Sequence, residues 1–368
     1  MSNPVDVKWF TSAMAGAPTL SGEVGKLIAV LDACLINGFG SVTLTSLIVS
    51  GGVATATKNG HGFLDHAVVR IAGATTSGLN GDKRIAWLNA NAFTFDATGI
   101  SDQTATGTIT AKMAPADWIK PYSGTNKAAY ARTDVLATAM LLRVDDSPTT
   151  YANIKAYETM SDVDTGTNAY PSIAIYQCKS SAASSTVRDW VVACDPKMLY
   201  FFARTGGNQW WDALIFGDIN SYKSGDAHHC LIYANQQSGY GYDLFYKTND
   251  TVTSRWIARA YAQTGTNVGC TLRTQGSPSA TNGLGITGNP YPNEVDNSFH
   301  AWPIEVWEGS TRARGLMPGM YNPIHSAAVL TQGMVIDSVP QLDGHRLFVQ
   351  MLYNSAACCA IDITGSWR

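Results

Sequence analysis

Residues 67–99 have the sequence AVVRIAGATTSGLNGDKRIAWLNANAFTFDATG, and they decide the fold class of the chain. Three segments rich in β-branched and aromatic residues (67–74, 83–90 and 92–97) are separated there by turn-forming pairs such as Asn80-Gly81. Short segments of this kind, bounded by Gly, Asn and Ser, are typical of β-strands joined by tight turns. Two more, 53–58 and 106–113, flank the stretch. Together they predict a small antiparallel β-barrel or sandwich that ends near Pro115.

Immediately before this stretch, SGEVGKLIAVLDACLIN (21–37) predicts the single convincing helix of the chain. We expect Ser21 to cap it and Glu23 to lie in its first turn, where a carboxylate favours the helix dipole. Asn37 and Gly38 supply the stop. Apolar residues recur at helical spacing and give one apolar face, formed by Val24, Leu27, Ile28, Leu31 and Leu35. We therefore expect the helix to dock by this face.

The longer part of the chain, 118–368, contains many more candidate strands, recurring every 10–18 residues with Gly-, Asn- and Ser-rich links. This pattern predicts a larger β-sandwich, jelly-roll-like, or a closed barrel. A long polar segment, 274–298, is expected to be a functional or mobile loop. The predicted protein is all-β. Its expected domains are an arm with the helix (1–40), a small β-barrel docking module (41–116) and a large sandwich (117–368).

The charge content argues against several classes of function. Only 14% of residues are charged and the formal net charge is −3, with no basic stripe of the kind that nucleic-acid binding needs. The sequence has no run of about 18 apolar residues, so we expect no membrane insertion. The N-terminal MSNPVDVKWF lacks a Sec-type signal, so we expect synthesis in a cytoplasm. Low charge also suggests a surface covered by neighbouring subunits, although a Thr- and Ser-rich β-protein would need few charges anyway.

Candidates for metal binding and catalysis are few. His228-His229-Cys230 is the most suggestive cluster, but adjacent residues on a strand point to opposite faces, so a shared ion is disfavoured. The seven cysteines lack the spacing of zinc ligands or of a disulfide framework, and we expect free buried thiols. Nucleophile-elbow and nucleotide-binding motifs are absent from the sequence. We expect no cofactor and no metal.

Carboxylate pairs could in principle support glycoside hydrolysis. Nothing in the sequence brings two of the candidates together, and Asp at a strand end usually serves a turn. We therefore predict that the protein is not an enzyme. The candidates are Asp145-Asp146, Asp162, Asp164, Asp189, Asp212, Asp218, Glu305 and Glu308.

The tryptophans leave three interpretations open. They can fill the core, line a protein interface, or stack on the sugar rings of a host polysaccharide. The core is the favoured interpretation, because one buried tryptophan covers a large area. The residues concerned are Trp190, Trp210, Trp211, Trp256, Trp302 and Trp307, together with Tyr240 and Tyr242.

The expected interface combines the helix face with apolar residues near the C-terminus. The segment RARGLMPGMYNPIH (312–325) is a stiff connection that could insert into a neighbouring subunit, although a plain sandwich crossover fits as well. The predicted interface residues are Leu27, Ile28, Leu31, Leu35, Met317, Met320, Tyr321 and Trp367.

Several of these segments carry a resemblance. The stretch from Leu31 to Asn126 resembles the front part of virion structural proteins of tailed bacteriophages, and the C-terminal segments resemble the ends of such proteins. The landmarks are CLINGFG (34–40), GGVATAT followed by GHGF (51–63), IAGATTSGLNG (71–81), FTFDATG (93–99), TGTITAKMAPADWIKPYSGTNKAAYAR (106–132), RARGLMPGMYNPIH (312–325), GHRLFVQ (344–350) and IDITGSWR (361–368).

The resemblance implies a structural role in the tail of a virion, in the tail tip or baseplate, where the protein would join the tail to peripheral parts or fibres. It also implies a small β-barrel module, and partners among other virion proteins. Because repeated subunits usually close into symmetric oligomers, we expect a ring or trimer of this chain. Two alternatives remain: a tail protein that binds a receptor or host surface glycan, and a capsid decoration or head–tail protein.

Overall fold

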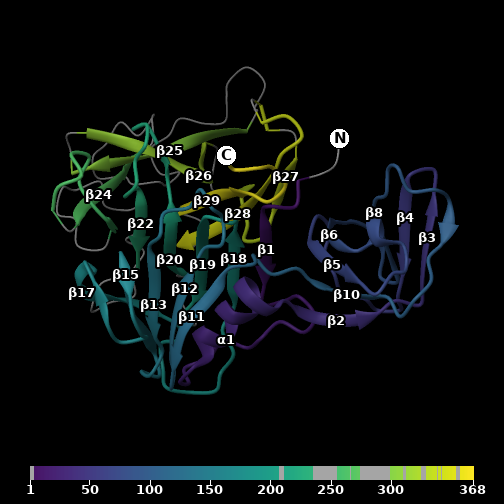
Figure 1. Cartoon of the computed structure of the whole chain (residues 1–368), viewed down its shortest axis with the longest axis horizontal. Helices are drawn as coiled ribbons and strands as arrows, with labels where there is room; N and C mark the ends of the chain where they lie inside the picture. Colours follow the sequence, from purple (N-terminus) through teal and green to yellow (C-terminus); the bar gives the residue numbers. More distant parts are fainter. Residues whose placement is uncertain are drawn as a thin grey trace.

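The chain is an all-β protein built from antiparallel sheets, which confirms the all-β part of the predicted fold class. The computed structural model describes residues 4–206, 211–234, 255–265, 267–273, 299–309, 312–324, 329–337, 339–340, 342–353 and 357–368. Figure 1 shows two parts. Strands between residues 39 and 113 form a small module on one side, and the other described residues form a larger body. The predicted polar loop at 274–298, together with Trp210, Tyr240 and Tyr242, lies outside the described residues.

The small module consists of two antiparallel sheets. The four-stranded sheet has the order β2 (Phe39–Thr43), β10 (Thr110–Met113), β5 (Val68–Ala72), β6 (Gly81–Arg84). The five-stranded sheet has the order β7 (Ala86–Asn89), β8 (Ala92–Asp96), β4 (Val53–Thr57), β3 (Ser46–Ser50), β9 (Gln103–Thr104). The chain passes from one sheet to the other at Ile85, between β6 and β7. Neither of these described sheets closes on itself, so the small module is a pair of open sheets and not a closed barrel.

Alternating side chains fill the space inside the module. Leu47 and Val49 of β3 are buried while Ile48 between them is exposed, as expected for a strand with one face in a core. Phe93 of β8 packs edge-on against Phe63, with ring centroids 5.6 Å apart. These strands therefore turn one face into the core of the module and the other to solvent.

The expected helix begins later than the sequence indicated. It consists of α1 (Lys26–Asp32), which continues into a π-helical turn, Ala33–Asn37. Its N-cap residue is Gly25 at φ 75°, and Ser21 instead donates its hydroxyl to Glu23 (2.7 Å). The prediction that Ser21 caps the helix and that Glu23 lies in its first turn is therefore wrong.

The capping carboxylate comes from a distant part of the chain. Asp146 Oδ2 accepts the backbone N–H groups of Leu27 (2.7 Å) and Ile28 (3.2 Å). The predicted apolar face is largely confirmed, because Leu27, Leu31 and Leu35 are fully buried, whereas Val24 is exposed. The predicted stop is also confirmed: the π-helical turn ends at Asn37 and Gly38 follows at φ 70°.

The body contains the largest sheet. Its order is β1 (Lys8–Thr11), β18 (Trp190–Cys194), β19 (Met198–Arg204), β20 (Trp211–Asp218), β22 (Cys230–Tyr233), β23 (Arg255–Ile257), β24 (Val268–Arg273), β25 (His300–Glu308), β26 (Arg312–Ile324), β29 (Ala357–Asp362), β28 (Arg346–Tyr353), β27 (Val335–Asp337), with β21 (Asn220–Ser221) paired to β26. Since β1 pairs with β18, the N-terminal arm is part of this sheet.

A second, five-stranded sheet of the body lies beside α1 in Figure 1. Its order is β11 (Ile119–Gly124), β12 (Lys127–Ala131), β13 (Leu141–Asp145), β14 (Tyr151–Tyr157), β17 (Tyr170–Cys178). A two-stranded ribbon, β15 (Thr159–Met160) with β16 (Gly166–Thr167), and a 3₁₀ turn at Ser77–Leu79 complete the described elements.

One hydrophobic core runs through both parts. Phe39 at the start of β2 packs against Phe10 of β1 (ring centroids 5.7 Å apart) and against Trp190 of β18 (6.4 Å). Phe10 and Trp190 are fully buried. The small module is therefore packed onto the body and is not joined to it by a linker alone. Among the described residues, no helix is long and apolar enough to cross a membrane.

Candidate functional site

A buried arginine fixes the small module to both ends of the chain. Arg84, the last residue of β6, donates to four backbone carbonyl oxygens: Pro4 (2.8 Å), Val7 (2.9 Å), His66 (2.7 Å) and Ile363 (2.7 Å). Burial lowers the pKa of this guanidinium to about 10, so it remains charged at neutral pH. Three separate segments supply the acceptors, so this one side chain ties the module to the N-terminal arm and to the C-terminal end of the chain.

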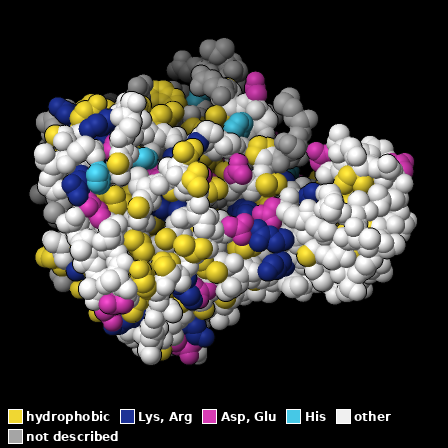
Figure 2. Space-filling model, in the orientation of Figure 1, with side chains coloured by type: hydrophobic (Ala, Val, Ile, Leu, Met, Phe, Trp, Pro, Cys, Tyr) yellow, Lys and Arg dark blue, Asp and Glu magenta, His cyan; other side chains and the backbone are white. Residues whose placement is uncertain are grey.

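A cluster of four charges lies at the same junction. Lys8 of β1 pairs with Asp82 of β6 (2.7 Å), and Arg70 of β5 bonds to Asp82 (2.6 Å) and to Asp117 (2.6 Å). Burial opposes ionisation of Asp82, but its bonds to Arg70 and Lys8 outweigh burial and lower its pKa. Figure 2 shows basic and acidic side chains gathered where the module meets the body. The cluster adds a second tie between the two parts.

A cleft of about 730 Å³ opens between the module and the C-terminal end of the body. The module contributes Val53, Thr94 and Asp96 to its wall, and the body contributes Asp343 and His345. This volume is within the range of small-molecule sites. Asp362 Oδ2, which is buried, hydrogen-bonds to His345 Nδ1 (2.6 Å) and so fixes the orientation of the imidazole. The cleft therefore holds at least one positioned polar group.

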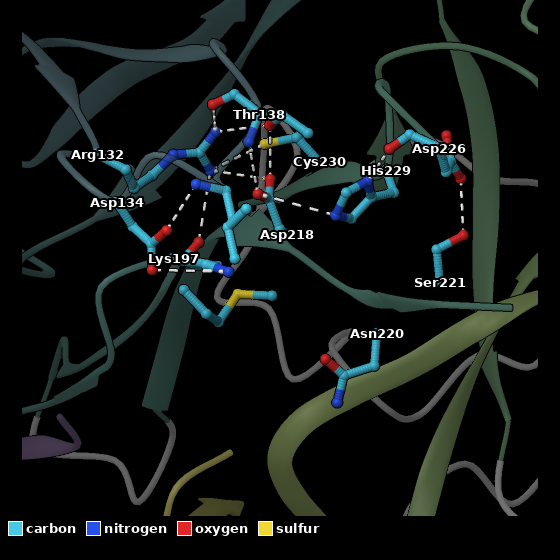
Figure 3. Close-up of polar contacts among 12 residues, drawn as sticks. Arg132, Asp134, Thr138, Lys197, Asp218, Asn220, Ser221, Asp226, His229 and Cys230 are labelled. Carbon is cyan, nitrogen blue, oxygen red and sulfur yellow. Dashed lines mark hydrogen bonds and ion pairs between the residues drawn. The ribbon is translucent and has the colours of Figure 1, made fainter. Parts of the chain in front are cut away.

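A fully buried ion pair anchors the loop between β12 and β13. Arg132 lies 3.3 Å from Asp218, with both side chains completely inaccessible to solvent. Thr138, at the other end of the loop, donates its N–H (2.7 Å) and its hydroxyl (2.6 Å) to Asp218, and its carbonyl accepts from Arg132 (2.6 Å). Figure 3 shows Arg132 and Thr138, from the two ends of the loop, meeting at Asp218. Both ends of the loop are therefore held by one buried group, Asp218.

The tip of this loop presents two aliphatic side chains to solvent. Val135 is 95% exposed and Leu136 is 76% exposed. Asp134 shapes the turn, because its carboxylate accepts the N–H of Leu136 (2.7 Å) while it lies 3.6 Å from Lys197. We name Val135 and Leu136 the body tip. An exposed apolar pair on an anchored loop is a preorganised contact surface, because little ordering remains to be done on binding.

A second exposed apolar surface lies on the small module. Trp87 and Leu88 of the edge strand β7 are about half exposed, and Leu64 is also exposed. Asp65, next to Leu64, accepts the backbone N–H of Trp87 (2.8 Å) and thereby brings the two segments together. We name Leu64, Trp87 and Leu88 the module patch. Tryptophan is enriched among the residues that dominate protein interfaces.

The His228-His229-Cys230 segment belongs to a hydrogen-bonded network. His228 Nδ1 contacts Gln263 (2.5 Å), His229 Nδ1 contacts the carbonyl of Asp226, and Cys230 Sγ lies 3.4 Å from Arg132. The three side chains thus have different partners. Within the described part of the chain, no group of three or more His, Cys, Asp or Glu residues is arranged to hold a metal ion.

Asp226 is the centre of the next polar cluster. Its carboxylate accepts from Arg314 Nε (2.7 Å) and from the hydroxyl of Ser221 (2.7 Å). Burial opposes ionisation, but these bonds outweigh it and lower the pKa of Asp226 to about 2. Arg314 also contacts Glu308. The cluster joins β21, β25 and β26 through charges that are shielded from water.

The predicted interface residues lie mostly inside the protein. Six of the eight are buried in the core of this chain: Leu27, Leu31, Leu35, Met317, Met320 and Trp367. Ile28 and Tyr321 are half-buried. The helix docks by its apolar face as expected, but on its own chain, and Met317 and Met320 belong to β26, a strand and not an exposed loop. The six buried residues are therefore not accessible to a subunit interface.

Neither the body tip nor the module patch was predicted from the sequence. The signal available for the tip was an apolar Val-Leu pair in an otherwise polar stretch, ARTDVLATA (131–139). Of the tryptophans considered earlier, Trp190 and Trp211 are buried, and Trp256, Trp302 and Trp307 are half-buried. Several candidate carboxylates are paired with cations: Asp146 with Lys179, Asp164 with Lys127 and Arg143, Asp218 with Arg132 and Glu308 with Arg314.

The chain matches no protein-family model, and no curated protein matches it significantly.

Proposed function

We propose that this protein is a structural component of a tailed-phage virion that connects two neighbouring proteins, in the tail tip or baseplate. One observation carries the proposal: two parts fixed to each other each present an exposed apolar surface, the module patch and the body tip. A chain with two such surfaces can hold two partners at a fixed separation. The resemblance of its front and C-terminal segments to tailed-phage structural proteins is the reason for proposing a tailed-phage virion.

The contact surfaces have suitable chemistry. Burying an aliphatic or aromatic side chain stabilises a complex by about 1.5–3 kcal/mol, before the costs of association are subtracted. Trp87 and Leu136 can each supply such a contact. The nearby carboxylates Asp65 and Asp134 already accept hydrogen bonds from the backbone, so they are held in place beside these contacts. Both surfaces therefore suit protein partners with apolar pockets.

The junction keeps the two surfaces at constant geometry. Arg84 ties the module to residues near both termini, and the cluster of Lys8, Arg70, Asp82 and Asp117 ties it again. In this proposal the small module is the docking unit and the body is the jelly-roll-like sandwich. Copies of the chain would assemble as a ring or trimer among other virion proteins, after synthesis in the host cytoplasm.

Immunogold labelling of intact particles, with antibody raised against the body, tests the location. Label at the tail end is the expected result. Label over the head would overturn the tail assignment and favour a capsid decoration or head–tail role. Particles assembled with Trp87→Ser or with Leu136→Asp should contain less of the protein, whereas Val187→Asp, a change at an exposed residue outside both surfaces, should leave its content unchanged.

The cleft supports a second candidate, binding of a host surface glycan. Its wall combines carboxylates and a positioned imidazole, which hydrogen-bond to hydroxyl groups, with apolar residues such as Val53. Binding of the purified protein to host cells, reduced by His345→Ala and by Asp96→Asn, would support this function. Binding that both variants retain, or no binding by the wild type, would count against it.

A further inference from the structure

The only fully buried lysine among the described residues lies directly against a fully buried aspartate. Lys179 Nζ contacts Asp146 Oδ1, and both side chains are completely inaccessible to solvent. Lys179 follows the last residue of β17, and Asp146 follows the last residue of β13. Since β14 lies between these two strands in the sheet, the pair bridges one end of β14.

The two side chains are held in complementary positions by backbone groups. Lys179 Nζ donates to the carbonyl of Glu23 (2.7 Å), which fixes the amine beside the carboxyl group. The other carboxyl oxygen, Asp146 Oδ2, accepts the N–H groups of Leu27 (2.7 Å) and Ile28 (3.2 Å). Two backbone donors on one oxygen are the arrangement that stabilises negative charge when a nucleophile attacks a carbonyl carbon.

Burial favours the uncharged forms that a reaction between the two groups requires. It raises the pKa of Asp146 and lowers the pKa of Lys179, while the contact between the two groups acts in the opposite direction. A neutral amine is the nucleophilic form of lysine. With both side chains buried, bulk water does not separate them and the zwitterion is not stabilised by hydration.

We propose that Lys179 and Asp146 condense to an intramolecular amide bond once the chain has folded. A proton passes from Nζ to Oδ1, which leaves an amine and a carboxylic acid. The Nζ lone pair attacks Cγ, and the charge that develops on Oδ2 is held by the N–H groups of Leu27 and Ile28. Nζ then gives a proton to Oδ1, the Cγ–Oδ1 bond breaks and one water molecule leaves. No oxidant, cofactor or second protein takes part.

The bond would tie the ends of two strands covalently. It would close the chain between residues 146 and 179 and join the ends of β13 and β17 across β14. Asp146 would keep Oδ2 as the amide oxygen, which still accepts the two N–H groups at the start of α1. A covalent tie at this point would resist the pulling apart of the sheet from its edge strand β17.

The intact mass of the purified full-length chain, measured after denaturation, tests the proposal. The expected mass is that of the sequence minus one water molecule, and Lys179→Met and Asp146→Ala should each show the full mass of their own sequence. Asp146→Asn should reach the same final mass as the wild type, because ammonia leaves in place of water. Fragmentation of a digest locates the bond.

Lys8 provides a matched control. It pairs with Asp82 at 2.7 Å, but that carboxylate also bonds to Arg70, which favours its charged form. Lys8→Met should therefore change the mass only by the substitution and still lack one water. A wild-type mass equal to the sequence mass would overturn the proposal, since the measurement does not depend on whether any variant folds. A water also missing from Lys179→Met would overturn it by placing the dehydration elsewhere.

Discussion

Arg84 Nη1 donates a hydrogen bond to the carbonyl oxygen of Ile363 at 2.7 Å, across 279 positions of sequence. The same guanidinium binds carbonyl groups of the N-terminal arm and of His66. No carboxylate accepts from it among its hydrogen bonds in the described structure. The charge is thus solvated by backbone dipoles of three segments, and the module, the arm and the C-terminal strand meet at one side chain.

Replacing Arg84 by Ala should destabilise the protein by about 3 kcal/mol or more, because four carbonyl groups lose a charged donor in a buried site. Urea unfolding followed by tryptophan fluorescence measures this difference in the free energy of unfolding. Lys83→Ala, at the neighbouring position in β6 where the hydrogen bond is exposed, should change it by about 0.5 kcal/mol at most. Equal effects of the two changes would contradict the role given to Arg84.

The buried pair of Arg132 and Asp218 predicts strong non-additivity. Arg132→Met should cost about 3–5 kcal/mol, because it removes the arginine partner of the buried Asp218 carboxylate. Adding Asp218→Leu should recover much of that loss, since the double variant buries no charge. The double-mutant cycle is measured by chemical denaturation. Simple addition of the two single effects would show that the two residues do not form a coupled pair.

Asp226 should contribute to acid sensitivity. Its folded-state pKa of about 2 lies below the ordinary value of 3.8, so the folded state favours the ionised form. Its contribution, about 2 kcal/mol, is fully present above pH 4 and is lost as the pH falls from about 4 to 2. Denaturation at a series of pH values should show a shallower acid dependence for Asp226→Asn than for the wild type. Asp343→Asn, at an exposed turn, should keep the wild-type dependence.

The body tip should matter for contacts and not for stability. Leu136→Asp removes an exposed side chain, so the free energy of unfolding should change by about 0.5 kcal/mol or less. Incorporation into particles should nevertheless fall, because a charge would have to be buried in the apolar pocket of the partner. Quantitative immunoblotting of purified particles measures this. Normal incorporation of a folded Leu136→Asp chain would exclude the tip as a contact.

Local patterns predicted the all-β class and the buried face of the helix, because short β-branched segments and helical spacing report which side chains meet a core. They did not predict every strand: β3 lies outside the segments predicted from the sequence. The start of the helix was predicted wrongly for a physical reason. The carboxylate that caps it belongs to Asp146, 119 positions from Leu27, and its position depends on the packing of the β13–β14 turn. Ser21 looked suitable only because local capping is the common case.

The prediction of the interface residues was wrong for a related reason. RARGLMPGMYNPIH contains Pro and Gly, which usually interrupt strands, yet its residues 312–324 form β26 within the large sheet. Gly319 there lies so close to the indole of Trp367 that a Cβ atom would clash with it. That contact explains why the segment contains a glycine and why Trp367 is buried. The new candidates for an interface, Trp87 and Leu136, can be recognised only from the fold, because the fold shows which apolar side chains remain exposed to solvent.

The carboxylate of Asp65 accepts a hydrogen bond from the backbone N–H of Trp87, which lies on the edge strand β7 of the small module. An incoming strand from another molecule would need that donor to extend the sheet. Neighbours can therefore meet β7 through its side chains but cannot continue its hydrogen-bond ladder there. In the proposed virion assembly this arrangement would oppose fibre formation, because β7 could contact a partner through its side chains without serving as a template for further strands.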